Sequence, residues 1–287
     1  MDKRRLKHLL VGEFTLKRLV RSTLLVIALV YIGVGIYGYF FTDKIIFQQP
    51  HATYKDTKQI LKLQTANGSP ISAIYLANPK AAYTILYSHG NAEDLGTDLN
   101  ALKDLRDLGF SVFAYDYNGY GTSAGTPSES NAYADVDAAY DYVTGNLRVA
   151  PERIIAYGRS LGGAMAVDPA SRKPLAGLII ESSFITAFRV VTRVPLFPFD
   201  KFQSIDKLKD VHCPVLVIHG KSDGVIPFWH GERLYQQASE PKMFLWIDKA
   251  GHNDLLEVAG EKYETALRKF RDSLKKPNKE SHTTSSL

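Results

Sequence analysis

Residues 153–166, RIIAYGRSLGGAMA, contain the pattern G-x-S-x-G from Gly158 to Gly162. The residues before it, RIIAY, form a short apolar run typical of a buried strand, and the residues after Ser160 favour a helix. Between a strand and a helix, this pattern predicts a sharp turn that lifts the serine hydroxyl into the open. We therefore expect Ser160 to be a nucleophile. The alternative is a glycine-rich turn whose hydroxyl takes no part in chemistry.

On both sides of this turn, short apolar runs alternate with amphipathic stretches. We expect strands at 59–64, 71–76, 82–88, 111–115, 153–157, 178–181, 215–219 and 243–247. We expect helices at 97–108, 129–147, 160–171 and 254–274. The alternation predicts an α/β fold with a mostly parallel central sheet and helices on both of its faces. Ligands in such folds bind at the carboxyl ends of the strands.

A serine hydroxyl is a poor nucleophile unless a base removes its proton. His252 lies in the segment KAGHND, between the last expected strand and the last expected helix, so its loop can bring an imidazole over Ser160. His89 and His219 each end a strand at a His-Gly pair, and packing or loop-shaping roles explain them better. We therefore predict that His252 is the base.

The base in turn needs a carboxylate that fixes its tautomer and stabilises the imidazolium. Asp223 follows the strand at 215–219 and precedes a helix. Glu181 is the rival, because it also ends a strand at the same edge of the sheet. We predict Asp223, which gives the order Ser160, Asp223, His252 along the chain.

A tetrahedral intermediate needs N–H donors that already point at its oxyanion. We expect one from the backbone of Leu161, the residue after the nucleophile. We expect the second from the backbone of Asn91, in the segment HGNA at 89–92, which follows the strand at 82–88. The alternative for that segment is a simple turn.

Four segments carry a resemblance to a known family: SHGNAEDLG at 88–96, YDYNGYGTSAGTPSESNAYADVDAAY at 115–140, GRSLGG at 158–163 and AGHNDLLEV at 250–258. They resemble the α/β-hydrolase-domain depalmitoylases and their single-pass membrane and bacterial relatives, within the α/β-hydrolase superfamily.

This resemblance implies an α/β-hydrolase fold and the cleavage of acyl esters or thioesters through a serine acyl-enzyme. The resemblance also implies that Ser160 is the nucleophile, Asp223 the acid and His252 the base. The chain departs from the animal depalmitoylases at its N-terminus, where those proteins carry a lipidated cysteine-rich segment. The one cysteine of this chain is Cys213, and its N-terminus is apolar instead.

The stretch at 22–41, STLLVIALVYIGVGIYGYFF, has twenty residues without a charge. At about 1.5 Å per residue, a helix of this length crosses a hydrocarbon core roughly 30 Å thick. A cleaved signal peptide is the alternative, but its apolar region is shorter and ends in small residues. We expect a retained transmembrane anchor, preceded by a basic segment at 1–21 and followed by a connector at 42–57. The basic segment predicts a cytoplasmic N-terminus and a hydrolase domain on the extracytoplasmic (periplasmic or lumenal) side.

The formal net charge of +5 comes from the N-terminal segment, since residues 1–21 carry seven Lys or Arg and two acids. Basic and acidic residues balance in the rest of the chain, so we expect no nucleic-acid partner. A single cysteine excludes an intrachain disulfide and a cysteine-based zinc site. With no metal-ligand spacing and no phosphate-loop pattern, we expect no cofactor and no metal. The oligomeric state is left open.

We place the hydrolase domain at 58–275, a small cap at about 182–212 and a disordered tail at 276–287. The cap contains the proline-broken stretch VPLFPF. We expect Leu196, Phe197 and Phe199 of that stretch to line an acyl pocket or to dip toward the bilayer; the alternative is that they pack the cap onto the core.

The expected function is a membrane-anchored serine hydrolase. It would cleave a small-molecule or lipid acyl ester, or an acylated protein. A serine peptidase or amidase of the same fold and a non-catalytic membrane-bound binding protein are the alternatives.

Overall fold

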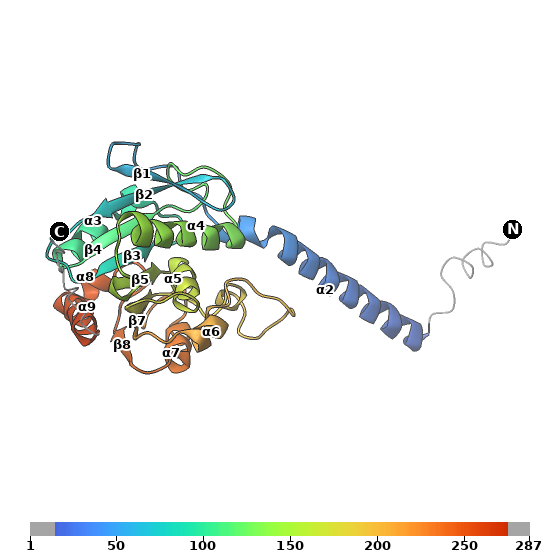
Figure 1. Cartoon of the computed structure of the whole chain (residues 1–287). Coiled ribbons are helices and arrows are strands. Elements are labelled where there is room, and N and C mark those ends of the chain that lie inside the picture. The colour runs from blue at the N-terminus through green and yellow to red at the C-terminus, as the bar shows by residue number, and fades with distance from the viewer. Residues whose placement is uncertain (1–14, 275–287) are drawn as a thin grey trace, which may run out of the picture. The chain divides into compact units, whose positions relative to one another are not determined.

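The structure is a computed structural model that describes residues 15–274. The predicted tail at 276–287 and most of the predicted basic segment lie outside the described residues. The chain divides into two compact units, one that ends at Ile45 and one that begins at Ile46. The first is helical and the second is an α/β domain (Figure 1).

Helix α2 spans Leu16–Ile46 and contains a window with a mean hydropathy of 2.2. By length and composition it could cross a membrane, although a signal sequence near the N-terminus meets the same conditions. It is longer than the apolar stretch predicted at 22–41. Lys17, Arg18 and Arg21 extend it at one end and Lys44 at the other, because straight-chain residues have high helix propensity.

The α/β domain contains a mixed sheet of eight strands within the described residues. They are β1 Ile60–Gln64, β2 Pro70–Leu76, β3 Thr84–Ser88, β4 Ser111–Tyr115, β5 Ile154–Arg159, β6 Gly177–Glu181, β7 Val215–Gly220 and β8 Lys242–Ile247. Their order across the sheet is β1-β2-β4-β3-β5-β6-β7-β8. Strand β2 pairs antiparallel with β1 and with β4, and the other pairs are parallel. The predicted mostly parallel sheet is confirmed.

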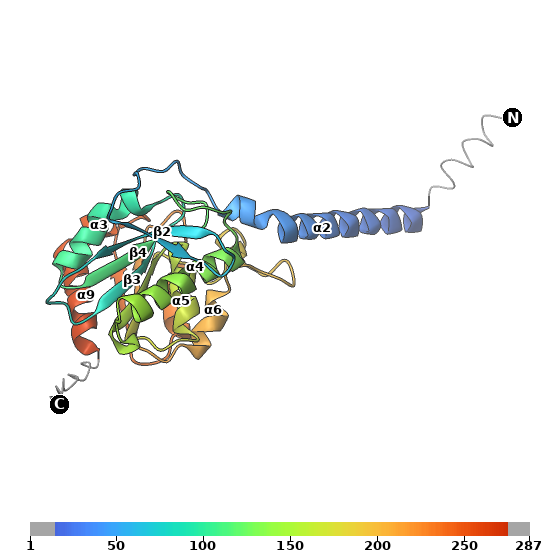
Figure 2. The ribbon, with the colours of Figure 1, turned by 45° about the horizontal axis from the view of Figure 1, so that its top comes forward.

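Helices cover both faces of this sheet (Figures 1 and 2). One face carries α3 Leu95–Asp107, α8 Leu255–Ala259 and α9 Glu261–Ser273. The other carries α4 Glu129–Asp141, α5 Gly162–Ala170, α6 Ser204–Lys207 and α7 Trp229–Gln237. Within β3, Ile85 and Tyr87 join the cluster under α3 and α9, whereas Leu86 joins the cluster under α4 and α5. Burial on both faces explains why these strands read as continuous apolar runs.

Two predicted helices differ from the structure. The helix expected at 254–274 is divided into α8 and α9 at Gly260, whose φ of 51° suits glycine and interrupts a regular helix. The helix expected at 129–147 ends at Asp141 and continues as one π-helical turn over Tyr142–Asn146. The other predicted elements lie within a few residues of their expected bounds, and the structure adds helices α6 and α7, for which no range was predicted.

Part of the segment predicted as a connector packs into the α/β domain. Phe47 is buried, and its ring makes edge contacts with Tyr120 and Phe202. The backbone N–H of Thr53 donates to Asp94, and the Tyr54 hydroxyl donates to Asp116. Residues 47–54 therefore help to hold the loops that follow β3 and β4.

Candidate active site

The G-x-S-x-G segment forms the predicted sharp turn between β5 and α5. Ser160 has a φ of 53°, in the left-handed region that non-glycine residues rarely occupy. Its backbone N–H donates to the Glu181 carbonyl at 2.8 Å, and its own carbonyl accepts from the Ser183 hydroxyl at 2.7 Å. Strand β6 and the segment directly after it thus hold both backbone polar groups of Ser160 in the strained turn.

The glycines of this segment permit close packing of backbone on backbone. A Cβ on Gly158 would overlap the carbonyl of Gly162, and a Cβ on Gly162 would overlap the carbonyl of Ser88. The backbones of strand β5, helix α5 and strand β3 can therefore approach one another more closely than residues with a Cβ would allow. As a result, Ser160 sits at the N-terminus of α5, directly above the end of β5.

Ser160, His252 and Asp223 form a chain of hydrogen bonds at the carboxyl ends of β5, β8 and β7. The His252 Nε2 atom lies 3.0 Å from Ser160 Oγ, and His252 Nδ1 lies 2.7 Å from Asp223 Oδ2. Because an ionised carboxylate only accepts, Nδ1 of a neutral His252 carries the proton and Nε2 accepts from the serine. The structure brings together the three residues predicted from the sequence.

Asp223 is held ionised by its surroundings. Its side chain is fully buried, and burial alone would raise the pKa of this carboxyl. Hydrogen bonds from His219 and His252 outweigh the effect of burial, so the pKa of Asp223 is lowered. Its second oxygen accepts the backbone N–H groups of Val225 and Ile226, both at 2.8 Å. These bonds fix the carboxylate in the orientation that meets the imidazole.

Among the described residues, none of the rivals hydrogen-bonds to the Ser160 hydroxyl, which contacts His252. Glu181 accepts from the hydroxyls of Tyr157 and Tyr263 on the α9 face of the sheet. His219 Nε2 lies 2.9 Å from the Ile226 carbonyl and 3.4 Å from Asp223 Oδ2, so it supports the loop and the carboxylate of Asp223. His89 Nδ1 contacts the Gly90 carbonyl, and burial lowers the pKa of His89 to about 4.

The loop after β3 is tied down by the side chain of Asn91. This amide donates to the Ile46 carbonyl and accepts from the Gln48 backbone at 2.9 Å. Of the neighbouring backbone N–H groups, that of Gly90 donates to Glu93 at 2.6 Å and that of Ala92 donates to Asn91 Oδ1 at 3.1 Å. These bonds anchor the loop, and the backbone N–H groups of the residues on both sides of Asn91 are already engaged.

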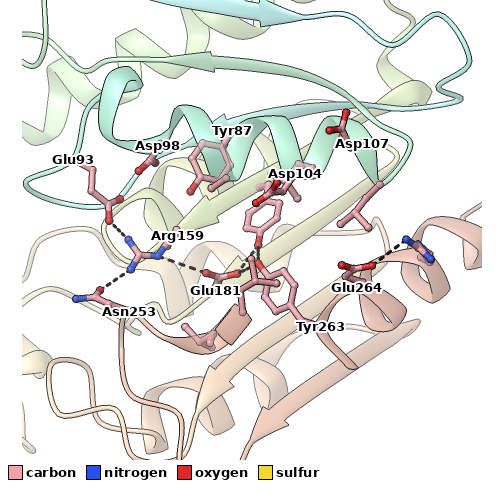
Figure 3. A pocket seen from close by; sticks show the side chains of 17 residues that line it. Tyr87, Glu93, Asp98, Asp104, Asp107, Arg159, Glu181, Asn253, Tyr263 and Glu264 are labelled. Atoms are coloured by element: carbon pink, nitrogen blue, oxygen red, sulfur yellow. Dashed lines mark hydrogen bonds and ion pairs between the residues drawn. The ribbon is translucent and has the colours of Figure 1, made fainter. Parts of the chain in front are cut away.

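Arg159 contributes to the site in a way that its sequence position did not predict. Its guanidinium contacts the His252 carbonyl at 3.3 Å and the Asn253 Oδ1 atom at 2.6 Å. It also pairs with Glu93 and lies 3.6 Å from Glu181 Oε1 (Figure 3). Arg159 therefore connects the loop of His252 with the loop of Asn91. The sequence feature that could have indicated this role is the charged side chain at the first variable position of G-x-S-x-G, directly before Ser160.

The cap residues proposed from the sequence lie on an irregular segment between β6 and β7. Leu196 is half exposed, at 52%. The rings of Phe197 and Phe199 stack with a centroid distance of 5.5 Å, and Phe199 makes an edge contact with Phe188. Val194 is also largely exposed, so this part of the cap presents apolar surface. Among residues 15–274, no group of three or more His, Cys, Asp or Glu is arranged to hold a metal ion.

Known proteins resemble this chain in sequence and in fold. Residues 78–198 match the family described as Serine aminopeptidase, S33. The α/β-hydrolase domain-containing protein 17B of Xenopus tropicalis is 39% identical over 220 residues, which cover 75% of this chain and 76% of that protein. Protein 17C of Mus musculus is 42% identical over 220 residues, covering 75% and 68%.

The chain belongs to the α/β-hydrolase domain-containing protein 17 family. It is a serine hydrolase, and the family resemblance stated from the sequence is confirmed. Solved structures agree on the fold. The Pyrococcus furiosus esterase Pf2001 superposes with a TM-score of 0.67 at 17% identity, over 79% of this chain and 99% of that one. The esterase RhEst1 of a Rhodococcus species has a TM-score of 0.60 at 18% identity, over 76% and 100%.

Proposed function

We propose that Ser160, His252 and Asp223 form the catalytic triad of an acyl-ester or thioester hydrolase held at a membrane by helix α2. The observation that carries this proposal is the continuous hydrogen-bonded chain from Ser160 Oγ through the imidazole to Asp223. A histidine that accepts from a serine hydroxyl and donates to a buried carboxylate is arranged for proton transfer.

In the proposed reaction, Ser160 Oγ attacks the carbonyl carbon of the acyl group while His252 Nε2 takes the hydroxyl proton. Asp223 stabilises the imidazolium that forms. The tetrahedral intermediate then collapses, and His252 gives its proton to the departing alkoxide or thiolate. Water, activated by the same imidazole, releases the acyl group from Ser160 and regenerates the free enzyme.

The developing oxyanion needs donors in place before the reaction. We assign these to the backbone N–H groups of Leu161, at the N-terminus of α5, and of Asn91. The helix dipole adds a favourable potential at Leu161. The bonds that engage Gly90 and Ala92 support Asn91 as the second donor, because they hold its loop in one conformation.

Replacing Arg159 should lower kcat without a matching change in KM, because the guanidinium positions the loops of His252 and Asn91. We expect Arg159→Gln to reduce kcat by about 10- to 100-fold, since small displacements of catalytic groups are costly. Arg159→Lys should recover part of the loss. Steady-state kinetics on a soluble ester would measure both. The matched control is Arg172→Gln, whose guanidinium binds Asp168 and Asp137 on the opposite face of the sheet. A kcat for Arg159→Gln equal to that of the control would contradict the positioning role.

For the substrate, we propose an acyl chain that contacts the apolar cap around Leu196, Phe197 and Phe199. The exposure of Leu196 and the aromatic stack of Phe197 and Phe199 support this assignment. The expected result is that kcat/KM rises with chain length over a series of p-nitrophenyl esters from acetate to palmitate. In Phe197→Ala and Phe199→Ala this preference should shrink by about 5- to 150-fold, which corresponds to about 1–3 kcal/mol for lost apolar contact. Equal rates for short and long esters in the parent protein, unaltered in both variants, would count against an acyl-binding cap.

A peptidase or amidase reaction is the second candidate, and the match to the serine aminopeptidase family favours testing it. The same triad chemistry serves both reactions, and the leaving group decides between them. A thioester, an ester and an anilide with the same acyl chain form the direct comparison. We expect the thioester and the ester to be cleaved and the anilide to be cleaved far more slowly. Faster cleavage of the anilide would make the amidase assignment correct.

We further propose that α2 is a retained anchor and that the hydrolase domain lies on the extracytoplasmic side. The length and hydropathy of the helix and the basic residues before it support this topology. The expected result in a bacterial host is that the full chain stays in the membrane pellet after alkaline carbonate extraction. Protease added to spheroplasts should then digest the hydrolase domain. A domain that is digested only after the membrane is lysed would place it on the cytoplasmic side instead.

A further inference from the structure

A cavity of about 750 Å³ lies beside the candidate active site on the α3 and α9 face of the sheet (Figure 3). Tyr87, Tyr157 and Glu181, from β3, β5 and β6, form its floor, with α3 on one side and α8 and α9 on the other. Neither Ser160, His252 nor Asp223 is among its lining residues. The cavity is therefore separate from the proposed triad, and a ligand could occupy it whether or not the proposed reaction is correct.

The lining is strongly acidic. It contains six carboxylates and two guanidinium groups: Glu93, Asp98, Asp104, Asp107, Glu181 and Glu264 against Arg159 and Arg268. Both guanidinium groups already pair with carboxylates of the cavity, Arg159 with Glu93 and Glu181, and Arg268 with Glu264. Asp107 pairs with Arg106 beside the cavity, so Asp98 and Asp104 are the lining carboxyls without an ion pair among the described residues. The excess of carboxylates over guanidinium groups favours cations in the cavity.

Asp98 is the group in this cavity that most needs a ligand. It projects from α3 into the lining and is only 9% exposed, and its Oδ2 atom has no hydrogen-bond partner among the described residues. Burial raises the pKa of Asp98, a hydrogen bond from the Tyr87 hydroxyl acts in the opposite direction, and the nearby Asp94 and Glu181 carboxylates raise it further. A buried carboxylate oxygen without a donor is costly, and buried polar atoms in native proteins nearly always have a partner.

The rest of the lining is aliphatic. Ala101 and Leu105 of α3, and Leu108 directly after it, line the cavity together with Leu255 and Leu256 of α8. An apolar stem fits between these side chains, whereas a compact inorganic cation would leave them uncovered. The absence of a metal-holding group among residues 15–274 also argues against a bare metal ion.

We propose that this cavity binds a protonated linear aliphatic amine. Its ammonium donates a hydrogen bond to Asp98 Oδ2, and its alkyl chain lies along the leucines of α3 and α8. A primary ammonium carries three donors, so it can contact the Tyr87 hydroxyl and a second carboxylate while it binds Asp98. The charge-assisted bond to Asp98 supplies most of the specificity.

The test is isothermal titration of the detergent-solubilised full chain with hexylamine, and with hexanol and hexanoate as neutral and anionic probes of the same length. We expect saturable binding of hexylamine, with hexanol and hexanoate at least about tenfold weaker. Asp98→Asn keeps the shape of the side chain and should weaken hexylamine binding by about tenfold or more. Leu256→Trp, which fills the apolar part from the rim, should also weaken it.

The matched control is Asp135→Asn, which neutralises another buried carboxyl on the opposite face, where Asp135 accepts from Asn118. This variant should bind hexylamine like the parent protein, and thermal unfolding should establish that both Asn variants are folded. Equal hexylamine affinity in folded Asp98→Asn and in the parent would overturn the proposal. Binding of hexanol as tight as that of hexylamine would overturn it as well, since the acidic lining would then contribute nothing.

Discussion

Replacing Ser160 with alanine should reduce kcat for ester hydrolysis by about 10⁴-fold or more, because the variant has no oxygen that can attack the acyl carbon. Any remaining rate would come from substrate binding and from the oxyanion donors that we propose at Leu161 and Asn91. The measurement is single-turnover hydrolysis of a p-nitrophenyl ester by detergent-solubilised protein, corrected for hydrolysis in detergent alone.

The matched control for this variant is Ser171→Ala, at the other end of helix α5, where the hydroxyl donates to the Asp168 carbonyl. It should keep the parent rate. Turnover by Ser160→Ala within tenfold of the parent protein would mean that the nucleophile lies elsewhere.

Replacing Asp223 with asparagine should lower kcat by about 10³- to 10⁴-fold while the protein stays folded. The amide that replaces the carboxylate can donate to His252 Nδ1, and this favours the tautomer whose Nε2 carries a proton and cannot accept from Ser160. The imidazolium also loses the negative charge that stabilises it. Steady-state kinetics across neutral pH would measure the loss.

Two controls separate this role from a general effect of charge. Asp248→Asn removes an exposed carboxylate that pairs with Lys221 and should leave kcat unchanged. Glu181→Gln tests the rival acid, and its loss should be much smaller than that of Asp223→Asn. If Glu181→Gln caused the larger loss, Glu181 would be the acid of the triad and the assignment of Asp223 would be wrong.

The parts of the fold and the site that were predicted correctly are encoded by short patterns of neighbouring residues. Each strand is a short apolar run, and Ser160, Asp223 and His252 each follow such a run closely. Parallel strands end at one edge of the sheet, so residues placed after three of them are brought together by the topology itself. For this reason the distances of 3.0 Å and 2.7 Å link the three residues that were predicted.

The parts that the sequence did not predict depend on contacts between distant segments. The role of Arg159 requires that Glu93 from one loop and Asn253 from another meet its guanidinium. The cavity exists because the leucines of α3 and α8 and the buried Asp98 converge from segments about 150 residues apart. Likewise, the break at Gly260 reflects a left-handed backbone conformation that a helical pattern of side chains does not reveal.

The candidate active site and the acidic cavity meet at Arg159. Its guanidinium contacts the His252 carbonyl and also pairs with Glu93 and Glu181 of the acidic cavity. The ammonium that we propose at Asp98 would compete with Arg159 if it took Glu93 or Glu181 as its second carboxylate. Kinetics with hexylamine present would show whether occupation of the cavity changes kcat in the parent protein and leaves Asp98→Asn unaffected.

The most direct test of the proposed triad is to map the site of a fluorophosphonate adduct on the detergent-solubilised full chain by tryptic digestion and mass spectrometry. Trypsin cleaves after Arg159 and Arg172, so Ser160 and Ser171 share one peptide and fragmentation distinguishes them. We expect a single adduct on Ser160 that is absent from His252→Gln, because the serine is then no longer activated. No adduct on Ser160, or an adduct on another serine such as Ser183, would contradict the assignment of Ser160 as the nucleophile.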